Sequence, residues 1–139
     1  MQDPGNLGTI IRLCDWFGIG TLVCSPDTVD CYNPKVLQAT MGSIARVNVV
    51  YTELKPFLKV TSLPVYGTFM TGDSIYETNF EKAGVLVLGN EAHGINTDLE
   101  DVTDFRVNIP QFGGQSAESL NVAMAAAIVL SEVCRPIRR

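Results

Sequence analysis

The chain has 139 residues, of which 46% are hydrophobic and 18% charged, and its formal net charge is −5. This length and composition predict one globular domain with a sizeable core, and they exclude a disordered chain. A protein that grips nucleic acid over its whole surface is normally basic, so the negative charge disfavours that class of binding.

The first half of the sequence predicts helices that alternate with short strands. Residues 3–8 read DPGNLG, a turn, and a helix is expected over residues 7–17, with Gly18 ending it. One face of this helix is apolar, and Arg12 points away from that face. Asn33 and Pro34 predict a second helix that runs to about residue 45. The expected strands of this half are residues 21–24 and 48–51.

The second half continues the alternation. Short helices are expected over residues 55–61 and 96–102, and strands over residues 65–69, 85–88 and 105–109. The strand over residues 85–88 is the most apolar, and it runs directly into the loop GNEAHG. Strands that alternate with helices predict an α/β fold with a parallel sheet and helices on both of its faces.

The last helix follows the loop QFGGQSAES, with Ser116 or Ser119 as its expected N-cap, and is predicted to run to about Cys134. No charge occurs between Ser119 and Ser131, and apolar residues occupy nearly every direction around the axis. This pattern predicts a helix buried on all sides, too short to span a membrane. Ser119 and Asn121 fall in its expected first turn, where polar side chains face a pocket.

No strand leads into the turn DPGNLG, because the first helix begins within a few residues of Met1. In a βαβ fold such a turn follows a strand. We therefore expect residues 1–139 to form one domain that lacks its first strand and whatever preceded that strand.

The cysteines are Cys14, Cys24, Cys31 and Cys134, and none forms a CxxC pair. Three of them lie in apolar runs, which favours reduced thiols in a cytoplasmic protein over disulfides or a metal site. His93 is the only histidine, so a His-rich metal site is excluded. The sequence contains no signal-peptide pattern or transmembrane run, so we expect neither a membrane nor a metal partner.

Three loops follow strands or open helices: residues 3–12, 89–95 and 110–121. Loops at the carboxyl ends of parallel strands build ligand sites, and none of these loops matches GxGxxG or a P-loop. The segments that contain these loops read DPGNLGTIIR (3–12), VLGNEAHGI (87–95) and IPQFGGQSAESLNVAMAAAI (109–128). Together they resemble the three motifs of the SpoU/TrmH family of RNA 2′-O-ribose methyltransferases, in the SPOUT superfamily. Gln111-Phe112 and the extra Gly113-Gly114 differ from the commonest third motif.

The resemblance implies S-adenosylmethionine as methyl donor, tRNA or rRNA as substrate, and a homodimer whose interface uses the first and last helices. It also implies a C-terminal trefoil knot, which periodicity would never suggest because knots are essentially absent from proteins. The cofactor-binding positions carried over from the motifs are Gly67, Thr68, Leu88, Gly89, Ile109, Leu120 and Ala123.

The same resemblance assigns a polar catalytic set. Its members are Asn6, Arg12, Glu91, Ser119 and Asn121. Asn6 and Glu91 would orient Arg12, while Ser119 and Asn121 would bind the ribose or its neighbouring phosphate. Methyl transfer needs the hydroxyl oxygen in line with the sulfonium methyl, so positioning is a large part of the catalysis.

Two other functions stay open at this point. The chain could be a non-catalytic RNA-binding module, or an unrelated α/β domain that binds a nucleotide at its helix N-termini. Binding of S-adenosylmethionine separates the enzyme from both. Which RNA and which nucleotide are methylated does not follow from the sequence.

Overall fold

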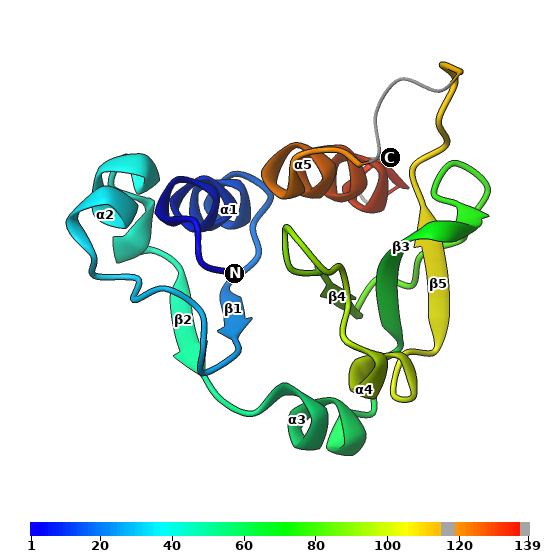
Figure 1. Ribbon diagram of the computed structural model, residues 1–139, viewed down its shortest axis with the longest axis horizontal. Coiled ribbons are helices and arrows are strands. Elements are labelled where there is room, and N and C mark those ends of the chain that lie inside the picture. The colour runs from blue at the N-terminus through cyan, green and yellow to red at the C-terminus, as the bar shows by residue number, and fades with distance from the viewer. Residues whose placement is uncertain (115–118, 137–139) are drawn as a thin grey trace. The chain divides into compact units, whose positions relative to one another are not determined.

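The computed structural model describes residues 1–114 and 119–136 (Figure 1). The chain divides into two compact units, residues 1–57 and residues 58–139. Each unit is described by itself below.

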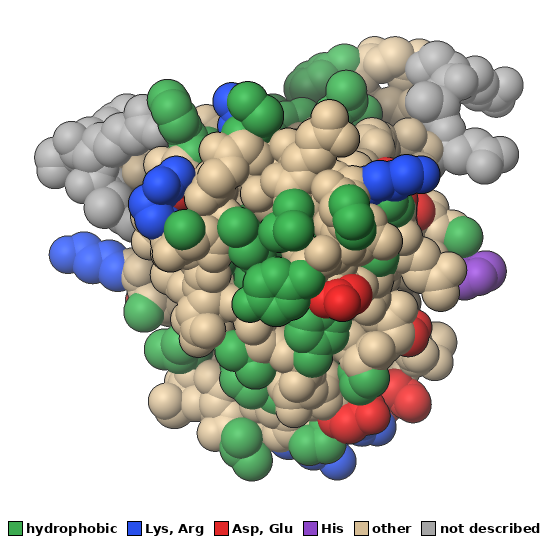
Figure 2. All heavy atoms as spheres, turned by 90° about the vertical axis from the view of Figure 1, so that its left-hand side faces the viewer, with side chains coloured by type: hydrophobic (Ala, Val, Ile, Leu, Met, Phe, Trp, Pro, Cys, Tyr) green, Lys and Arg blue, Asp and Glu red, His purple; other side chains and the backbone are tan. Residues whose placement is uncertain are grey.

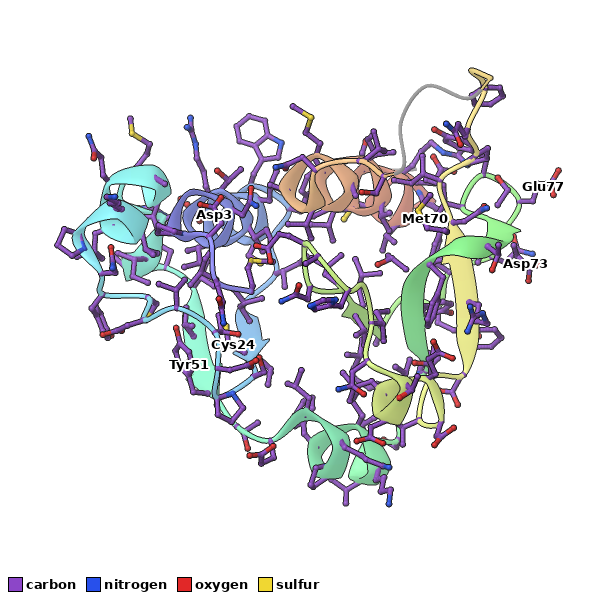
Figure 3. All side chains as sticks on the ribbon, in the orientation of Figure 1. Asp3, Cys24, Tyr51, Met70, Asp73 and Glu77 are labelled. Atoms are coloured by element: carbon purple, nitrogen blue, oxygen red, sulfur yellow. The ribbon has the colours of Figure 1, made fainter. Side chains whose placement is uncertain are left out.

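Unit 1, residues 1–57, contains a small parallel sheet of two strands, β1 (Thr21–Cys24) and β2 (Asn48–Tyr51). Both strands have the predicted bounds. Cys24 pairs with Tyr51 at the end of this ladder (Figure 3). The helices of the unit are α1 (Pro4–Trp16) and α2 (Pro34–Thr40), and α3 (Leu54–Val60) contains the boundary to the second unit. Figure 2 shows hydrophobic side chains gathered at the surface that faces the viewer. Among the residues of unit 1, Tyr32 and Met41 are exposed.

Helix α1 begins earlier than the sequence predicted, because DPGNLG is not a turn. Asp3 is the N-cap, and its Oδ2 accepts a hydrogen bond from the Asn6 backbone N–H at 3.2 Å. Pro4 occupies the first turn, where its fixed φ suits a helix. The buried face carries Leu7, Gly8, Ile10, Ile11 and Cys14, while Arg12 is exposed, as predicted. Capping and packing thus outweigh the low helix propensity of the two glycines.

Helix α2 ends at Thr40, so the prediction that it continues to residue 45 is wrong. Its start is confirmed, because the Asn33 side chain accepts a hydrogen bond from the Lys35 N–H at 2.9 Å. Met41 and Gly42 have φ values of 51° and 88°, and two left-handed residues in succession interrupt a right-handed helix. A short 3₁₀ turn, η1 (Ser43–Ala45), follows.

Unit 2, residues 58–139, is built on a three-stranded parallel sheet in the order β4-β3-β5. Its elements are β3 (Val65–Ser74), β4 (Val85–Val87), α4 (Thr97–Glu100), β5 (Phe105–Asn108) and α5 (Val122–Cys134). Val129 of α5 packs into a core with Tyr66, Ile75 and Val107. The parallel pairing in both units confirms the predicted α/β class.

Strand β3 is longer than predicted, and its pairing with β5 is irregular. Val107 pairs with both Thr68 and Asp73, so residues 69–72 bulge out of the ladder. Figure 3 labels Met70 and Asp73 in this region. Gly72 has φ 145°, and a Cβ there would lie 2.6 Å from the Arg106 carbonyl oxygen. The bulge thus brings backbone against backbone at a position that only glycine accommodates.

All four cysteines are free, and Cys14, Cys24 and Cys31 are buried. Across the described ranges, no helix is long and apolar enough to cross a membrane. Within the same residues, no group of three or more His, Cys, Asp or Glu side chains is arranged to hold a metal ion.

Candidate functional site

The carboxyl ends of β4 and β5 are level with residues 67 and 68 of β3, just before its bulge, since the three strands of unit 2 are parallel. This level is called the sheet edge below. Gly67 is level with Val87 of β4, and Thr68 is level with Val107 of β5. The Thr68 hydroxyl also donates a hydrogen bond to the Val87 carbonyl at 3.1 Å. The edge therefore gathers five residues that the sequence predicted to bind the cofactor: Gly67, Thr68, Leu88, Gly89 and Ile109.

The loop after β4 folds back on itself in a compact way. Asn90 and Gly94 exchange two backbone hydrogen bonds of 2.9 Å, and the Asn90 side chain accepts one from the Ala92 N–H at 2.8 Å. A Cβ on Gly89 would lie 2.4 Å from the carbonyl carbon of Gly94. These contacts hold the loop close to the sheet edge, with Glu91 exposed at its tip.

Asn121, not Ser119, is the N-cap of α5. Its Oδ1 accepts hydrogen bonds from the backbone N–H groups of Ala123 at 2.9 Å and Met124 at 3.2 Å. Asparagine caps helices as well as serine does, so the helix starts at Val122 and leaves Ser119 outside it. The other predicted cap, Ser116, lies outside the described residues. Ser119 and Leu120 are exposed just before the helix, and Ala123 is buried in its first turn.

Helix α5 is not buried on all sides, so that prediction is wrong for this chain. Ala123, Ala126, Val129 and Leu130 are buried, whereas Met124 is 64% exposed. Leu120, just before the helix, is 49% exposed. The helix covers the sheet with one face, and composition alone cannot show which apolar face is covered.

Asn6 and Arg12 lie in unit 1, on the same helix α1. Asn6 is half-buried in the first turn, and Arg12 is exposed in the third. Glu91, Ser119 and Asn121 belong to unit 2. Two members of the predicted catalytic set therefore lie in unit 1 and the other three in unit 2.

Sequence reasoning missed two residues that shape these loops. Asp3 caps α1 and so positions Asn6 and Arg12 on a continuous helix. Asn90 closes the loop that presents Glu91, through its backbone pair with Gly94 and its side-chain bonds. Asp and Asn at the start of a turn are the signal that could have found both.

A shallow, open hollow of unit 2 lies beside the amino ends of β3 and β5. Its lining includes Pro64, Lys82, Asp104 and Phe105. None of the predicted site residues lines it, and we assign it no part in the function.

Comparison with known proteins agrees with the motif resemblance. Residues 1–131 match the SpoU rRNA methylase family. The chain is 39% identical over 134 residues to the 23S rRNA (guanosine(2553)-2′-O)-methyltransferase RlmP of Bacillus subtilis, covering 94% of this chain and 53% of that protein. The chain thus spans about half the length of the curated relatives it matches.

Two solved structures are similar in fold as well as sequence. One is a putative RNA methyltransferase of the TrmH family from Porphyromonas gingivalis, with a TM-score of 0.90 and 42% identity over 97% of this chain and 56% of that one. The other is the SpoU methyltransferase AviRb from Streptomyces viridochromogenes in complex with AdoMet, with a TM-score of 0.88 and 29% identity over 99% of this chain and 57% of that one. An unrelated α/β nucleotide-binding domain is therefore excluded. The chain belongs to the SpoU rRNA methylase family.

Proposed function

We propose that this chain carries the methyl-transfer site of an RNA 2′-O-ribose methyltransferase that uses S-adenosylmethionine. Ribosomal RNA is the proposed substrate, because the Bacillus subtilis relative is named for 23S rRNA, and tRNA is the competing substrate to test. The observation that carries the proposal is the sheet edge of unit 2, to which Thr68, Gly89 and Ile109 belong. Residues 1–131 of the same chain match the family.

The residues proposed for the cofactor suit S-adenosylmethionine. Leu88, Ile109 and Leu120 offer apolar surface suited to the faces of an adenine ring, and the nearby backbone offers donors and acceptors for its polar edge. Ala123 is buried and small, so the start of α5 leaves room close to its backbone. Bound there, S-adenosylmethionine supplies an electrophilic methyl group. No metal is part of the proposal.

The polar residues would position the ribose and stabilise developing charge. Arg12 would grip a phosphate bidentately and stabilise the alkoxide that forms as the 2′-hydroxyl loses its proton. Asn6 and Glu91 would orient Arg12, and Ser119 would contact the ribose. Because the helix cap uses Oδ1 of Asn121, this side chain would contact RNA as a donor, through its amide nitrogen.

The proposed enzyme is a cytoplasmic homodimer whose interface uses the first and last helices, and the trefoil knot belongs to the same proposal. Support for the interface comes from Met124 on α5 and Leu120 before it, which are 64% and 49% exposed. Adjacent apolar side chains on a surface favour burial by a partner. Sedimentation at micromolar concentration tests this, and a monomer there would contradict it.

Calorimetry with S-adenosylmethionine and transfer of a labelled methyl group to RNA test the reaction. We expect binding, and labelling of rRNA in nucleotides that resist alkaline hydrolysis, because a methylated 2′-oxygen cannot attack the neighbouring phosphate. RNA with a 2′-deoxyribose at the target is the control and should accept no label. A folded protein that binds RNA without binding S-adenosylmethionine would instead be a non-catalytic RNA-binding module.

A further inference from the structure

The tryptophan of α1 contributes little to the core of unit 1. Trp16 is 80% exposed, although tryptophan side chains are highly buried on average. The other face of α1 packs through Leu7, Ile11 and Cys14. Because the helix buries that face, it presents the indole of Trp16 at the surface.

Trp16 shares its face of α1 with Arg12. Residues four apart in a helix are neighbours on its surface, separated by about 6 Å along the axis. Arg12 is exposed, and the exposed positions before it on this face are Gly5 and Thr9. The exposed positions of this face therefore place one large aromatic side chain beside one cation, while Leu13, three residues before Trp16, is half-buried.

Asp15, the carboxylate next to Trp16 in the sequence, already has a positively charged partner. The Arg46 guanidinium contacts both oxygens of Asp15, with Nη2 to Oδ2 at 2.7 Å, and the Ser43 hydroxyl donates to Oδ2 at 2.8 Å. The hydrogen bonds from Arg46, and then that from Ser43, lower the pKa of Asp15, so it stays ionised and paired. Arg12 thus gives this part of an acidic chain a local positive charge, which favours a phosphate.

We infer that Trp16 is a base-stacking residue that holds a nucleobase of the RNA substrate next to the phosphate or ribose contacted by Arg12. This inference rests on the proposed function and adds a substrate-positioning residue to it. Single-stranded RNA is bound by aromatic faces that stack on bases, together with cations that contact the backbone. The Arg12–Trp16 face provides one group of each kind at adjacent positions.

A second copy of this chain is the alternative occupant, because the proposed homodimer also uses α1. A protein interface of that kind buries an apolar stripe, but the other exposed positions of this face are Gly5, Thr9 and Arg12, and Leu13 beside Trp16 is half-buried. One exposed aromatic side chain beside an arginine matches RNA better than an apolar helix partner. The experiment below separates the two occupants.

Trp16 is the only tryptophan in the chain, so fluorescence excited selectively at tryptophan reports on this side chain alone. We expect a short single-stranded RNA, titrated at low salt, to quench the emission as a base stacks on the indole. The same RNA with abasic sites should bind more weakly and without quenching. Unchanged emission under saturating RNA, with binding shown by the anisotropy of labelled RNA, would overturn the inference. So would emission that shifts with protein concentration alone, because a second copy would then cover Trp16.

Variants separate stacking from a structural effect. Trp16→Ala should weaken RNA binding by about 5- to 150-fold, and Trp16→Phe should keep most of the affinity because an aromatic face remains. Tyr32→Ala removes another exposed aromatic of unit 1, 69% exposed, and should bind RNA like the parent. Parent-like affinity of Trp16→Ala would contradict the inference.

Calorimetry with S-adenosylmethionine keeps the two proposals distinguishable. Trp16→Ala should bind the cofactor as the parent does. If the parent protein bound both the cofactor and RNA but showed no quenching, only the role of Trp16 would be overturned. A parent protein that does not bind the cofactor would overturn the proposed reaction.

Discussion

Gly8 of α1 and Ala39 of α2 lie so close that a Cβ on Gly8 would be 2.4 Å from the Cβ of Ala39. The same Cβ would be 2.6 Å from the Val36 carbonyl oxygen, a backbone atom that cannot rotate away. This close approach joins the helix that carries Arg12 to its neighbour within unit 1. The glycine is thus required by packing and not by its φ angle.

We predict that Gly8→Ala lowers the free energy of unfolding by about 1–3 kcal/mol, because overpacking two helices forces them apart. This cost exceeds the gain of about 1 kcal/mol that alanine brings to a helix interior. Gly5→Ala is the matched control, since its Cβ would meet nothing closer than 3.7 Å, and it should be neutral or stabilising. Urea denaturation followed by circular dichroism measures both, and Gly8→Ala as stable as Gly5→Ala would refute the packing explanation.

Gly89 has an equivalent role in the loop after β4, where the neighbour is again backbone. A Cβ on Gly89 would lie 2.4 Å from the carbonyl carbon of Gly94 and 2.6 Å from the backbone nitrogen of Ile95. We expect Gly89→Ala to weaken binding of S-adenosylmethionine at least tenfold, because the loop must move from the strand ends. Gly20→Ala, with nothing within 4 Å of its Cβ, should bind normally. Calorimetry decides, and equal affinity of the two variants would count against this site.

The pattern of the sequence predicted elements best where local chemistry decides them. Strands β1 and β2 have the predicted bounds, and α3 is displaced by one residue. The errors at element ends have two causes. Helix α1 begins at Pro4 because Asp3 caps it, a local signal that the turn prediction missed. Strand β3 extends beyond residue 69 because its bulge is fitted against Arg106, a residue distant in the sequence. No local pattern encodes such distant contacts.

Prediction of the site had a similar limit. The order of strands sufficed to predict that the loops over residues 89–95 and 110–121 follow the carboxyl ends of parallel strands. The cofactor positions Thr68, Leu88 and Ile109 were carried over from the family motifs. The roles of Arg12 and Ser119 came from the family resemblance alone, because an exposed arginine and an exposed serine have no distinctive local pattern. The exposure of Met124 was missed because hydrophobicity does not reveal which face a neighbour covers.

Weakly acidic groups of unit 1 predict a loss of stability at alkaline pH. Burial raises the pKa of the Cys14 and Cys24 thiols from 9.0 to about 11. Partial loss of solvent, and then the nearby Cys24, raise the pKa of the more exposed Tyr51 from 10.0 to about 12. Between about pH 9 and 11 the unfolded chain loses protons that the folded chain keeps, so the free energy of unfolding falls as pH rises.

Urea midpoints at pH 7, 9 and 10.5 test this effect. The midpoint should be steady up to about pH 9 and fall above it. Cys14→Ser removes one of these groups, so its midpoint should fall less steeply, whatever its value at pH 7. A midpoint that is constant to pH 10.5 in the parent would show that these groups titrate normally.

Asn121 allows capping to be separated from RNA contact. Asn121→Ala removes the acceptor for the Ala123 and Met124 N–H groups and should cost about 0.5–2 kcal/mol of stability. Asn121→Asp keeps that acceptor but loses the amide donor and adds a negative charge. We expect it to retain stability while methyl transfer falls. Thermal denaturation and the methylation assay measure the two effects, and an active Asn121→Asp enzyme would leave Asn121 with a capping role only.

Arg12 is the residue on which the proposed chemistry depends most. It lies on the exposed face of α1, away from Ile11 and Cys14, so the core does not need it. If it were an ordinary surface arginine, Arg12→Ala would change stability by only about ±0.5 kcal/mol and leave activity intact. The proposed function gives the same small change in stability but a large loss of methyl transfer.

We expect Arg12→Ala to bind S-adenosylmethionine normally and to transfer methyl groups about 100-fold or more slowly, as when one charge-stabilising donor is removed from an active site. An arginine normally keeps its proton in proteins, so we favour a charged Arg12 that grips phosphate and stabilises the alkoxide over one that acts as the general base. Arg12→Lys keeps the charge but loses the bidentate fork, and should recover only part of the rate. Lys59→Ala, which removes an exposed cation from α3, should methylate RNA like the parent. If Arg12→Ala methylated RNA at the rate of Lys59→Ala, the loss of a charge at this position would have no catalytic consequence, and the assignment of Arg12 would be wrong.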